Sequence, residues 1–240
     1  MYELLDRGSL ATMLNSEEGR VSLPYLRRLR IMSETLRALN FLHTGGCNGL
    51  EIQHRDIKPH NICFTEDWSS KLIDCGLARI ERMEDPSSTN VGETLFTDTF
   101  GLVGTDGYIC RAYWNGMRPY QSACDIYSFG IVMIELITGT LNRHGTAFPG
   151  GFYNYFVASI TGKAVQNSQA KLMEKCDDLV NWSGVDLPKL CKLALQCLSL
   201  DVTERPTAKV LVYEINAMLL RGEIGDLPVE YVSIDRKSVV

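Results

Sequence analysis

Four polar residues carry the chemistry that this sequence offers most clearly: Asp56, Lys58, Asn61 and Asp74. Asn61 and Asp74 supply oxygen ligands of the kind that magnesium accepts while it keeps positions for water and phosphate oxygens. The carboxylate of Asp56 can orient a hydroxyl group and take its proton. The ammonium of Lys58 can offset charge that builds on a phosphoryl group during transfer. The pattern therefore indicates phosphoryl transfer, in which a protein supplies positioning and electrostatics more than covalent chemistry.

These four residues need a scaffold that places two separate segments side by side. Ile52 to Phe64 is expected to be a loop that enters a short strand, and Lys71 to Ile73 is expected to be a second strand. A polar turn between them would make the pair a small hairpin. The hairpin would bring Asn61 and Asp74 within reach of one cation.

The remainder of the chain is predicted to be mainly helical, because apolar residues recur at helical spacing in several segments. The expected helices are Pro24 to His43, Asp125 to Thr138, a short one around Tyr153 to Ile160, Leu187 to Leu200, and Thr207 to Leu220. Ser22, Asp186 and Thr207 are of the types that cap helix starts. Glu81 to Gly104 is polar without periodicity, and such a long stretch is expected to be functional or disordered. His43 is expected to be a surface or cap residue, as is His144.

The bulk composition sets limits on the class of protein. The 240 residues are 45% hydrophobic and carry a net charge of −5, which fits one globular domain and argues against a general affinity for nucleic acid or anionic membrane. The eight cysteines form no CxxC pair, so a structural zinc site is not expected. They favour a reducing, cytoplasmic setting. No signal peptide or membrane-spanning run is expected, and the chain is compatible with the cytosolic part of a receptor.

The segment His54–Asn61 and the later Asp74–Cys75–Gly76 resemble the catalytic loop and the metal-binding loop of eukaryotic protein kinases. Other segments resemble the same family along nearly the whole chain: Gly104–Tyr108, Asp125–Gly130, Glu204–Pro206 and Tyr2–Leu10. The last is similar to the tyrosine-kinase-like group, which includes the interleukin-1-receptor-associated, receptor-interacting and plant receptor-like kinases. The resemblance implies a mainly α fold with a small β-hairpin, the C-terminal lobe of a kinase, over residues 1–240.

The resemblance also implies roles for individual residues. Asp56 would be the catalytic base and Lys58 the cation that faces the phosphate. Asn61 and Asp74 would bind Mg²⁺, with Mn²⁺ as an alternative, and Asn61 and Lys58 would line the phosphate side of ATP. Asp125 would brace the catalytic loop.

The adenine side of ATP is assigned by the same resemblance. Glu3 and Leu5 would offer backbone groups to the base, and Tyr2 would be the gatekeeper. Cys63, Val132 and Leu136 would lie beneath the adenine ring or support that floor.

Substrate class and regulation follow from a further set of residues. Lys58 together with Thr105 resembles the serine/threonine arrangement, so a protein Ser or Thr hydroxyl is the expected acceptor. Arg55 beside Asp56 implies control by phosphorylation of the activation segment, about 74–112, because a phosphate pairs with such an arginine. Thr97 and Thr99 are the preferred phosphorylation sites. Three further candidates are Ser87, Ser88 and Thr89.

Three features depart from the family pattern. The Gly-rich loop and the strand lysine of the N-terminal lobe are not in these 240 residues, so this chain alone is expected to bind ATP weakly and to transfer little phosphate. Cys75 stands where the family has phenylalanine. Arg111–Ala112 stands in place of Pro-Glu, so Arg205 lacks its usual glutamate. Either another acid replaces that glutamate or the activation segment is held loosely.

Two functions therefore stay open. One is a serine/threonine kinase catalytic domain that lacks its N-terminal lobe. The other is a non-catalytic kinase-like module that serves as a scaffold or decoy. In either case the surface that normally meets the N-terminal lobe would be exposed, and a partner protein would be expected to cover it.

Overall fold

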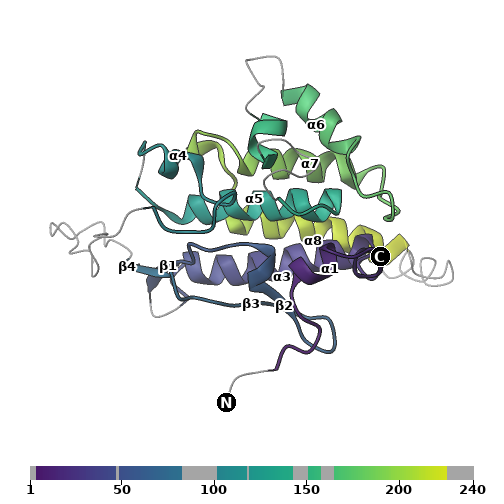
Figure 1. The fold of residues 1–240 in the computed structure, drawn as a ribbon, viewed down its shortest axis with the longest axis horizontal. Coiled ribbons are helices and arrows are strands. Elements are labelled where there is room, and N and C mark those ends of the chain that lie inside the picture. The colour runs from purple at the N-terminus through teal and green to yellow at the C-terminus, as the bar shows by residue number, and fades with distance from the viewer. Residues whose placement is uncertain are drawn as a thin grey trace, which may run out of the picture.

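The computed structural model describes residues 4–46, 49–82, 102–117, 119–142, 151–157 and 165–225. Within these ranges helices predominate, and the strands form two small antiparallel pairs (Figure 1). The helices are α1 (Leu10–Leu14), α2 (Glu17–Val21), α3 (Tyr25–His43), α4 (Arg111–Trp114), α5 (Ser122–Thr138), α6 (Val165–Met173), α7 (Asp186–Cys197) and α8 (Ala208–Gly225). The strands are β1 (Leu50–Gln53), β2 (Ile62–Phe64), β3 (Ser70–Leu72) and β4 (Arg79–Arg82). Short helical turns are η1 (Pro59–Asn61), η2 (Tyr153–Val157) and η3 (Val202–Glu204). The predicted fold class, mainly α with a small hairpin, is confirmed.

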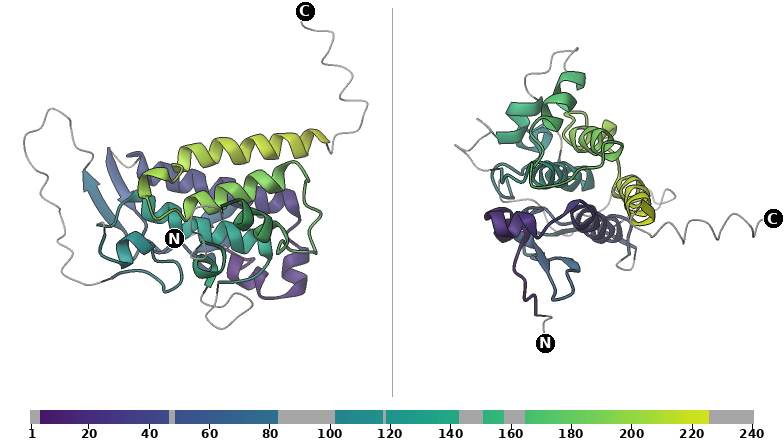
Figure 2. Two further views of the ribbon diagram at one scale, coloured as in Figure 1. Left: turned by 90° about the horizontal axis from the view of Figure 1, so that it is seen from above. Right: turned by 90° about the vertical axis from the view of Figure 1, so that its right-hand side faces the viewer.

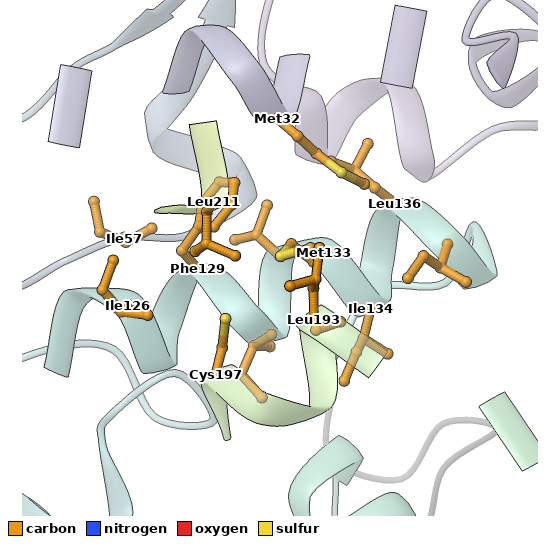
Figure 3. Close-up of a cluster of buried hydrophobic side chains, with 14 of the residues drawn as sticks. Met32, Ile57, Ile126, Phe129, Met133, Ile134, Leu136, Leu193, Cys197 and Leu211 are labelled. Atoms are coloured by element: carbon orange, nitrogen blue, oxygen red, sulfur yellow. The ribbon is translucent and has the colours of Figure 1, made fainter. Parts of the chain in front are cut away.

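Helix α5 is the centre of the molecule. Every residue from Cys124 to Thr138 is buried, which agrees with the apolar character of the sequence on all sides of this helix. Figures 1 and 2 show α3 and α7 on opposite sides of α5, with α8 packed along α3. Figure 3 shows the resulting core, where Met32 of α3, Phe129 and Met133 of α5, and Cys197 of α7 meet. Gly139 ends α5 in the left-handed conformation, with φ of 66°.

Helix α3 follows its predicted boundaries closely. Its apolar stripe, which includes Leu29, Met32 and Leu36, is fully buried. The predicted cap at Ser22 is wrong, because Pro24 occupies the N-cap position and makes no side-chain cap bond. Ser22 instead ends α2, and its hydroxyl donates to the Gly19 carbonyl at 2.6 Å.

The C-terminal helices test two other predicted caps. Asp186 is the first residue of α7, not its cap, and its carboxylate accepts hydrogen bonds from the Tyr25 hydroxyl at 2.6 Å and from Arg221 Nε at 3.2 Å. Thr207 does cap α8, because its Oγ1 accepts a hydrogen bond from the backbone N–H of Val210 at 3.3 Å. The predicted helix around 153–160 is seen as the π-helical turn η2, and its residues 158–160 lie outside the described ranges.

The two strand pairs frame the polar loops. Strands β2 and β3 form the predicted hairpin, with Ile62 opposite Leu72. Strands β1 and β4 form a second antiparallel pair that was not predicted, with Ile52 opposite Ile80. No helix among the described residues combines the length and the apolar character that spanning a bilayer requires.

Candidate active site

The backbone itself brings the two polar loops together. Strand β1 ends directly before His54, and β3 ends just before Ile73. Ile73 is bonded to the first loop on both sides: its N–H donates to the Asn61 carbonyl at 2.9 Å, and its carbonyl accepts from His54 Nε2 at 3.0 Å. Asp74, the next residue, is therefore held beside the loop that carries Asp56 and Asn61.

Asp56 lies at the centre of a hydrogen-bonded group of four side chains. Its Oδ2 accepts from Lys58 Nζ at 2.7 Å and from Asn61 Nδ2 at 3.1 Å. Its Oδ1 accepts from the Thr105 hydroxyl at 2.6 Å. Lys58 also donates to the Thr105 oxygen at 2.8 Å. The structure thus unites four of the predicted site residues, and Thr105 comes from a segment far along the chain.

These contacts keep the Asp56 carboxylate ionised. Burial acts to raise the pKa of Asp56, since a charge is less stable away from water. The hydrogen bonds from Lys58 and Thr105, the charge of Lys58 and the bond from Asn61 outweigh burial and hold the pKa below its usual value. The carboxylate is therefore ready to accept a hydrogen bond at neutral pH.

Asp74 has a different environment. It is exposed, it adopts a left-handed backbone with φ of 64°, and its Oδ1 accepts from the N–H of Gly76 at 3.2 Å. Among the described residues, no three His, Cys, Asp or Glu side chains gather in a group that could hold a metal. The predicted ligands are instead one carboxylate and one amide. Asn61 uses its amide nitrogen for both contacts with Asp56, so its side-chain oxygen is the atom that suits a hard cation.

Asp125 braces the catalytic loop as the resemblance implies. This fully buried carboxylate accepts from the backbone N–H of His54 at 2.8 Å and of Arg55 at 2.9 Å. It also accepts from the Tyr120 hydroxyl at 2.7 Å, and His43 Nε2 lies at 2.8 Å. These bonds hold Arg55 in a left-handed conformation, with φ of 70°, which positions Asp56.

Burial raises the pKa of Asp125, but the hydrogen bond and charge of His43, with the bonds from Tyr120 and Arg55, more than offset it, and the pKa is lowered. The expectation that His43 is a surface or cap residue is wrong. His43 is the last residue of α3, and its ring contacts the buried carboxylate of Asp125.

The nucleotide-side predictions are only partly within the described residues. Leu5 is half-buried, and Cys63 is 8% exposed in β2. The segment after Leu5 is tied to β2, because Phe64 N–H donates to the Gly8 carbonyl at 3.0 Å. Val132 and Leu136 are fully buried in α5, so they can support an adenine floor but cannot contact a base. Tyr2 and Glu3 lie outside the described residues.

The regulatory predictions fall in two places. Arg55 is 9% exposed, and its guanidinium lies over the Tyr120 ring at 5.4 Å. Thr97 and Thr99 lie outside the described residues, as do Ser87, Ser88 and Thr89.

Arg205 makes hydrogen bonds with other groups in place of the family's glutamate. Ala112 is buried, and the Arg205 guanidinium donates to the carbonyls of Ser199 at 2.9 Å and Ala123 at 2.7 Å. It also donates to Cys110 Sγ at 3.1 Å and lies over the ring of Tyr127. The described contacts of Arg205 include no carboxylate.

Glu135 has a structural role that no motif in the sequence indicates. It lies in an apolar stretch of the sequence, yet its carboxylate accepts hydrogen bonds from the Tyr108 hydroxyl at 2.6 Å and from the N–H of Asn142 at 2.8 Å. It thereby anchors the segment that carries Thr105 onto α5. A glutamate in a helix that is otherwise apolar on every side was the signal that could have revealed it.

Comparison with known proteins agrees with this geometry. Residues 1–214 match the family described as "Protein kinase domain". The chain is 31% identical, over 90% of its length, to a probable LRR receptor-like serine/threonine-protein kinase of Arabidopsis thaliana, and covers 23% of that protein. It is 29% identical over 95% of its length to the Arabidopsis probable serine/threonine-protein kinase PBL28, of which it covers 57%. It is 33% identical over 87% of its length to the Arabidopsis U-box domain-containing protein 35, of which it covers 23%. The chain thus spans only part of each of these relatives. With Asp56 braced by Asp125 and bonded to Lys58, Asn61 and Thr105, and with a match over most of its length, this chain belongs to the protein kinase family.

Proposed function

We propose that this chain provides the C-terminal lobe of a protein serine/threonine kinase, which transfers the γ-phosphoryl group of ATP to a serine or threonine hydroxyl of a protein. The single observation that carries the proposal is the hydrogen-bonded group of Asp56, Lys58, Asn61 and Thr105. The names of the relatives, two of which are serine/threonine-protein kinases, support the same acceptor class.

Asp56 has room for a substrate hydroxyl. An ionised carboxylate offers about four acceptor sites. Lys58 and Asn61 occupy Oδ2, and Thr105 occupies one site on Oδ1. The remaining site on Oδ1 would orient the incoming hydroxyl. Because its lowered pKa makes Asp56 a weak base, it would take the proton late, after phosphoryl transfer has begun to acidify that hydroxyl.

The other residues would handle the nucleotide. Asn61 and Asp74 would hold Mg²⁺, or Mn²⁺ in its place, which supplies charge neutralisation on the phosphates. Lys58 would stabilise charge on the transferring group, and its hold on both Asp56 and Thr105 fixes its ammonium at that position. Leu5 and Cys63, with Glu3, would line the adenine side. Arg55 would pair with a phosphate on Thr97 or Thr99.

A second function, that of a non-catalytic scaffold or decoy, has an observation in its favour. Ala112 leaves Arg205 without the family's glutamate, and Cys75 leaves a smaller side chain in the metal-binding loop. Leu4 and Leu77 expose apolar side chains near the segments that would face another lobe. A partner protein that covers this surface is part of the proposal in either case.

One assay separates the two functions. The full-length protein would be expressed in its native cells and isolated, both with the natural sequence and as Asp56→Asn. The transfer of phosphate from labelled ATP to a mixture of proteins that contain Ser and Thr would then be compared for the two. We expect phosphoserine or phosphothreonine that disappears in Asp56→Asn. If neither protein transfers phosphate while both still bind a partner protein, the catalytic proposal is wrong and the scaffold function takes its place. The isolated 240-residue chain is expected to bind Mg²⁺–ATP weakly, which a fluorescent ATP analogue would measure.

A further inference from the structure

The end of the activation segment carries a buried cluster of sulfur atoms opposite Arg205. Cys110 precedes α4 and Cys124 lies in the first turn of α5, and neither side chain is exposed. Arg205 is 6% exposed and donates to Cys110 Sγ at 3.1 Å. A guanidinium that is removed from water in this way is costly unless an anion lies against it.

The sulfur of Cys110 accepts a hydrogen bond from Arg205 Nη1 at 3.1 Å, and Cys124 and the backbone N–H of Tyr113 act on the same sulfur. A thiolate accepts such hydrogen bonds and supplies the negative charge that a buried guanidinium needs, whereas a neutral thiol supplies none. The other Arg205 bonds go to the neutral carbonyls of Ser199 and Ala123, and its Nη2 has no hydrogen-bond partner among the described residues.

The titratable groups around this sulfur agree with an anion. The hydrogen bond from Cys124, followed by the charge of Arg205, lowers the pKa of Cys110 to about 5. The same contact and burial raise the pKa of Cys124. Tyr120 and Tyr127 also face Cys110, and burial raises the pKa of both above its ordinary value. Of these four groups, Cys110 alone has a pKa below its ordinary value.

A route for small reagents lies close to the sulfur. A cavity of about 350 Å³ is lined by Ile109 and Arg111, the residues on either side of Cys110, and by Tyr127, whose ring contacts Arg205. Helix α4 is four residues long, so a small local opening would connect the cavity with the sulfur.

We propose that Cys110 is a hydroperoxide-sensitive thiolate that takes the place of the missing carboxylate opposite Arg205, with Cys124 as its disulfide partner. The Cys110 thiolate attacks one oxygen of the hydroperoxide, the O–O bond breaks, and Cys110 sulfenic acid and hydroxide, or an alkoxide, are formed. The Cys124 sulfur then attacks the sulfenic sulfur, and water leaves with the Cys124 proton as the disulfide forms. The two thiols lose two electrons and the hydroperoxide gains them. The product no longer offers an anion to Arg205.

This inference goes beyond the proposed kinase function and does not rest on it, so its tests use no phosphate transfer. The first test is the dependence of thermal stability on pH. A thiol with a lowered pKa contributes stability that is complete above its ordinary value of 9.0 and is lost as the pH falls through about 5. The melting temperature of the 240-residue chain should therefore rise from pH 5.5 to 8.5 relative to Cys110→Ser.

Two matched variants sharpen this comparison. Cys191→Ser also removes a buried thiol, but burial raises the pKa of Cys191 to about 12, so this variant should keep the pH dependence of the natural sequence. Cys110→Asp should restore stability at pH 7 and remove the dependence above pH 6, because a carboxylate is ionised throughout. If the melting temperature of Cys110→Ser or of Cys110→Asp depends on pH in the same way as that of the natural sequence, Cys110 is not a thiolate.

The second test is oxidation itself, and it needs no variant that could fail to fold. The chain would be treated with a slight excess of hydrogen peroxide at pH 6, alkylated and digested, with the exposed Cys75 as the reference. Mass spectrometry should find a Cys110–Cys124 disulfide before Cys75 is oxidised. Cys124→Ser should instead give a Cys110 sulfenic acid that dimedone traps. Oxidation of Cys75 while Cys110 stays reduced would overturn the proposal.

Discussion

His43 and Asp125 are joined across the molecule, with 2.8 Å between His43 Nε2 and Asp125 Oδ2. His43 ends α3, and Asp125 lies in the first turn of α5. The same carboxylate holds the backbone N–H groups of His54 and Arg55. Helix α3, helix α5 and the loop that carries Asp56 thus depend on one buried side chain for their relative position.

Asp125→Asn should destabilise the chain by about 3–5 kcal/mol, because an amide cannot accept from four donors and leaves buried groups unpaired. Urea unfolding followed by circular dichroism would measure the loss. Asp178→Asn is the matched control, since Asp178 is exposed and should cost less than about 0.5 kcal/mol. Similar losses for the two variants would contradict the bracing role.

The Asp125 brace also predicts a direction of pH dependence. Its lowered pKa means that its contribution to stability is complete above the ordinary value of 3.8 and is lost as the pH falls through the lower value in the folded state. The difference in unfolding free energy between the natural sequence and Asp125→Asn should therefore be constant from pH 7 to 5 and narrow below pH 4. A difference that narrows between pH 7 and 6 would point to another group.

Asp56→Asn should lower kcat for phosphate transfer by roughly 10²–10⁴, the usual contribution of a positioned general base. The KM for ATP should change little, because Asp56 is assigned to the acceptor hydroxyl and not to the nucleotide. Steady-state kinetics of the full-length protein, isolated from its native cells, would measure both constants. Asp67→Asn, an exposed carboxylate in the hairpin turn, should leave both unchanged.

Two arginines of α3 make ion pairs in opposite environments. Arg28 is fully buried, and its Nη2 lies 2.6 Å from Asp177, whereas Arg30 pairs with Glu223 while both side chains are about half exposed. Arg28→Ala should cost about 3–5 kcal/mol, because it leaves Asp177 buried with less compensation. Arg30→Ala should cost about 0–1 kcal/mol. Denaturation curves for the two variants would measure these losses in unfolding free energy. Equal losses would show that the burial of an ion pair does not determine how much its removal costs.

Gly130 lets α5 and α7 approach closely. A methyl group at this position would lie 2.5 Å from Cys197 Cβ and 2.5 Å from Leu198 Cδ1, closer than carbon atoms pack. Gly130→Ala should destabilise the chain by about 1–3 kcal/mol despite the higher helix propensity of alanine. Gly184→Ala meets nothing within 4 Å and is the control. A stabilised Gly130→Ala would show that the helices separate without cost.

The sequence by itself determined the elements whose signal is local. Helix α3 was predictable because one apolar stripe at helical spacing must be buried, and the β2–β3 hairpin because its strands are neighbours along the chain. Asp56, Lys58 and Asn61 were recognisable because their roles depend on close spacing in one loop. The burial of α5 followed from its apolar composition on every side.

Only the tertiary structure decided which residues far apart in the sequence contact one another. The pairing of β1 with β4, the contact of His43 with Asp125 and the anchoring of Tyr108 by Glu135 join residues with no local pattern that relates them. The same is true of Cys110, which a sequence presents as one more apolar residue and the fold places against Arg205. The physical reason is that spacing along the chain encodes local geometry, whereas the partner of a buried polar group is fixed by how the helices pack.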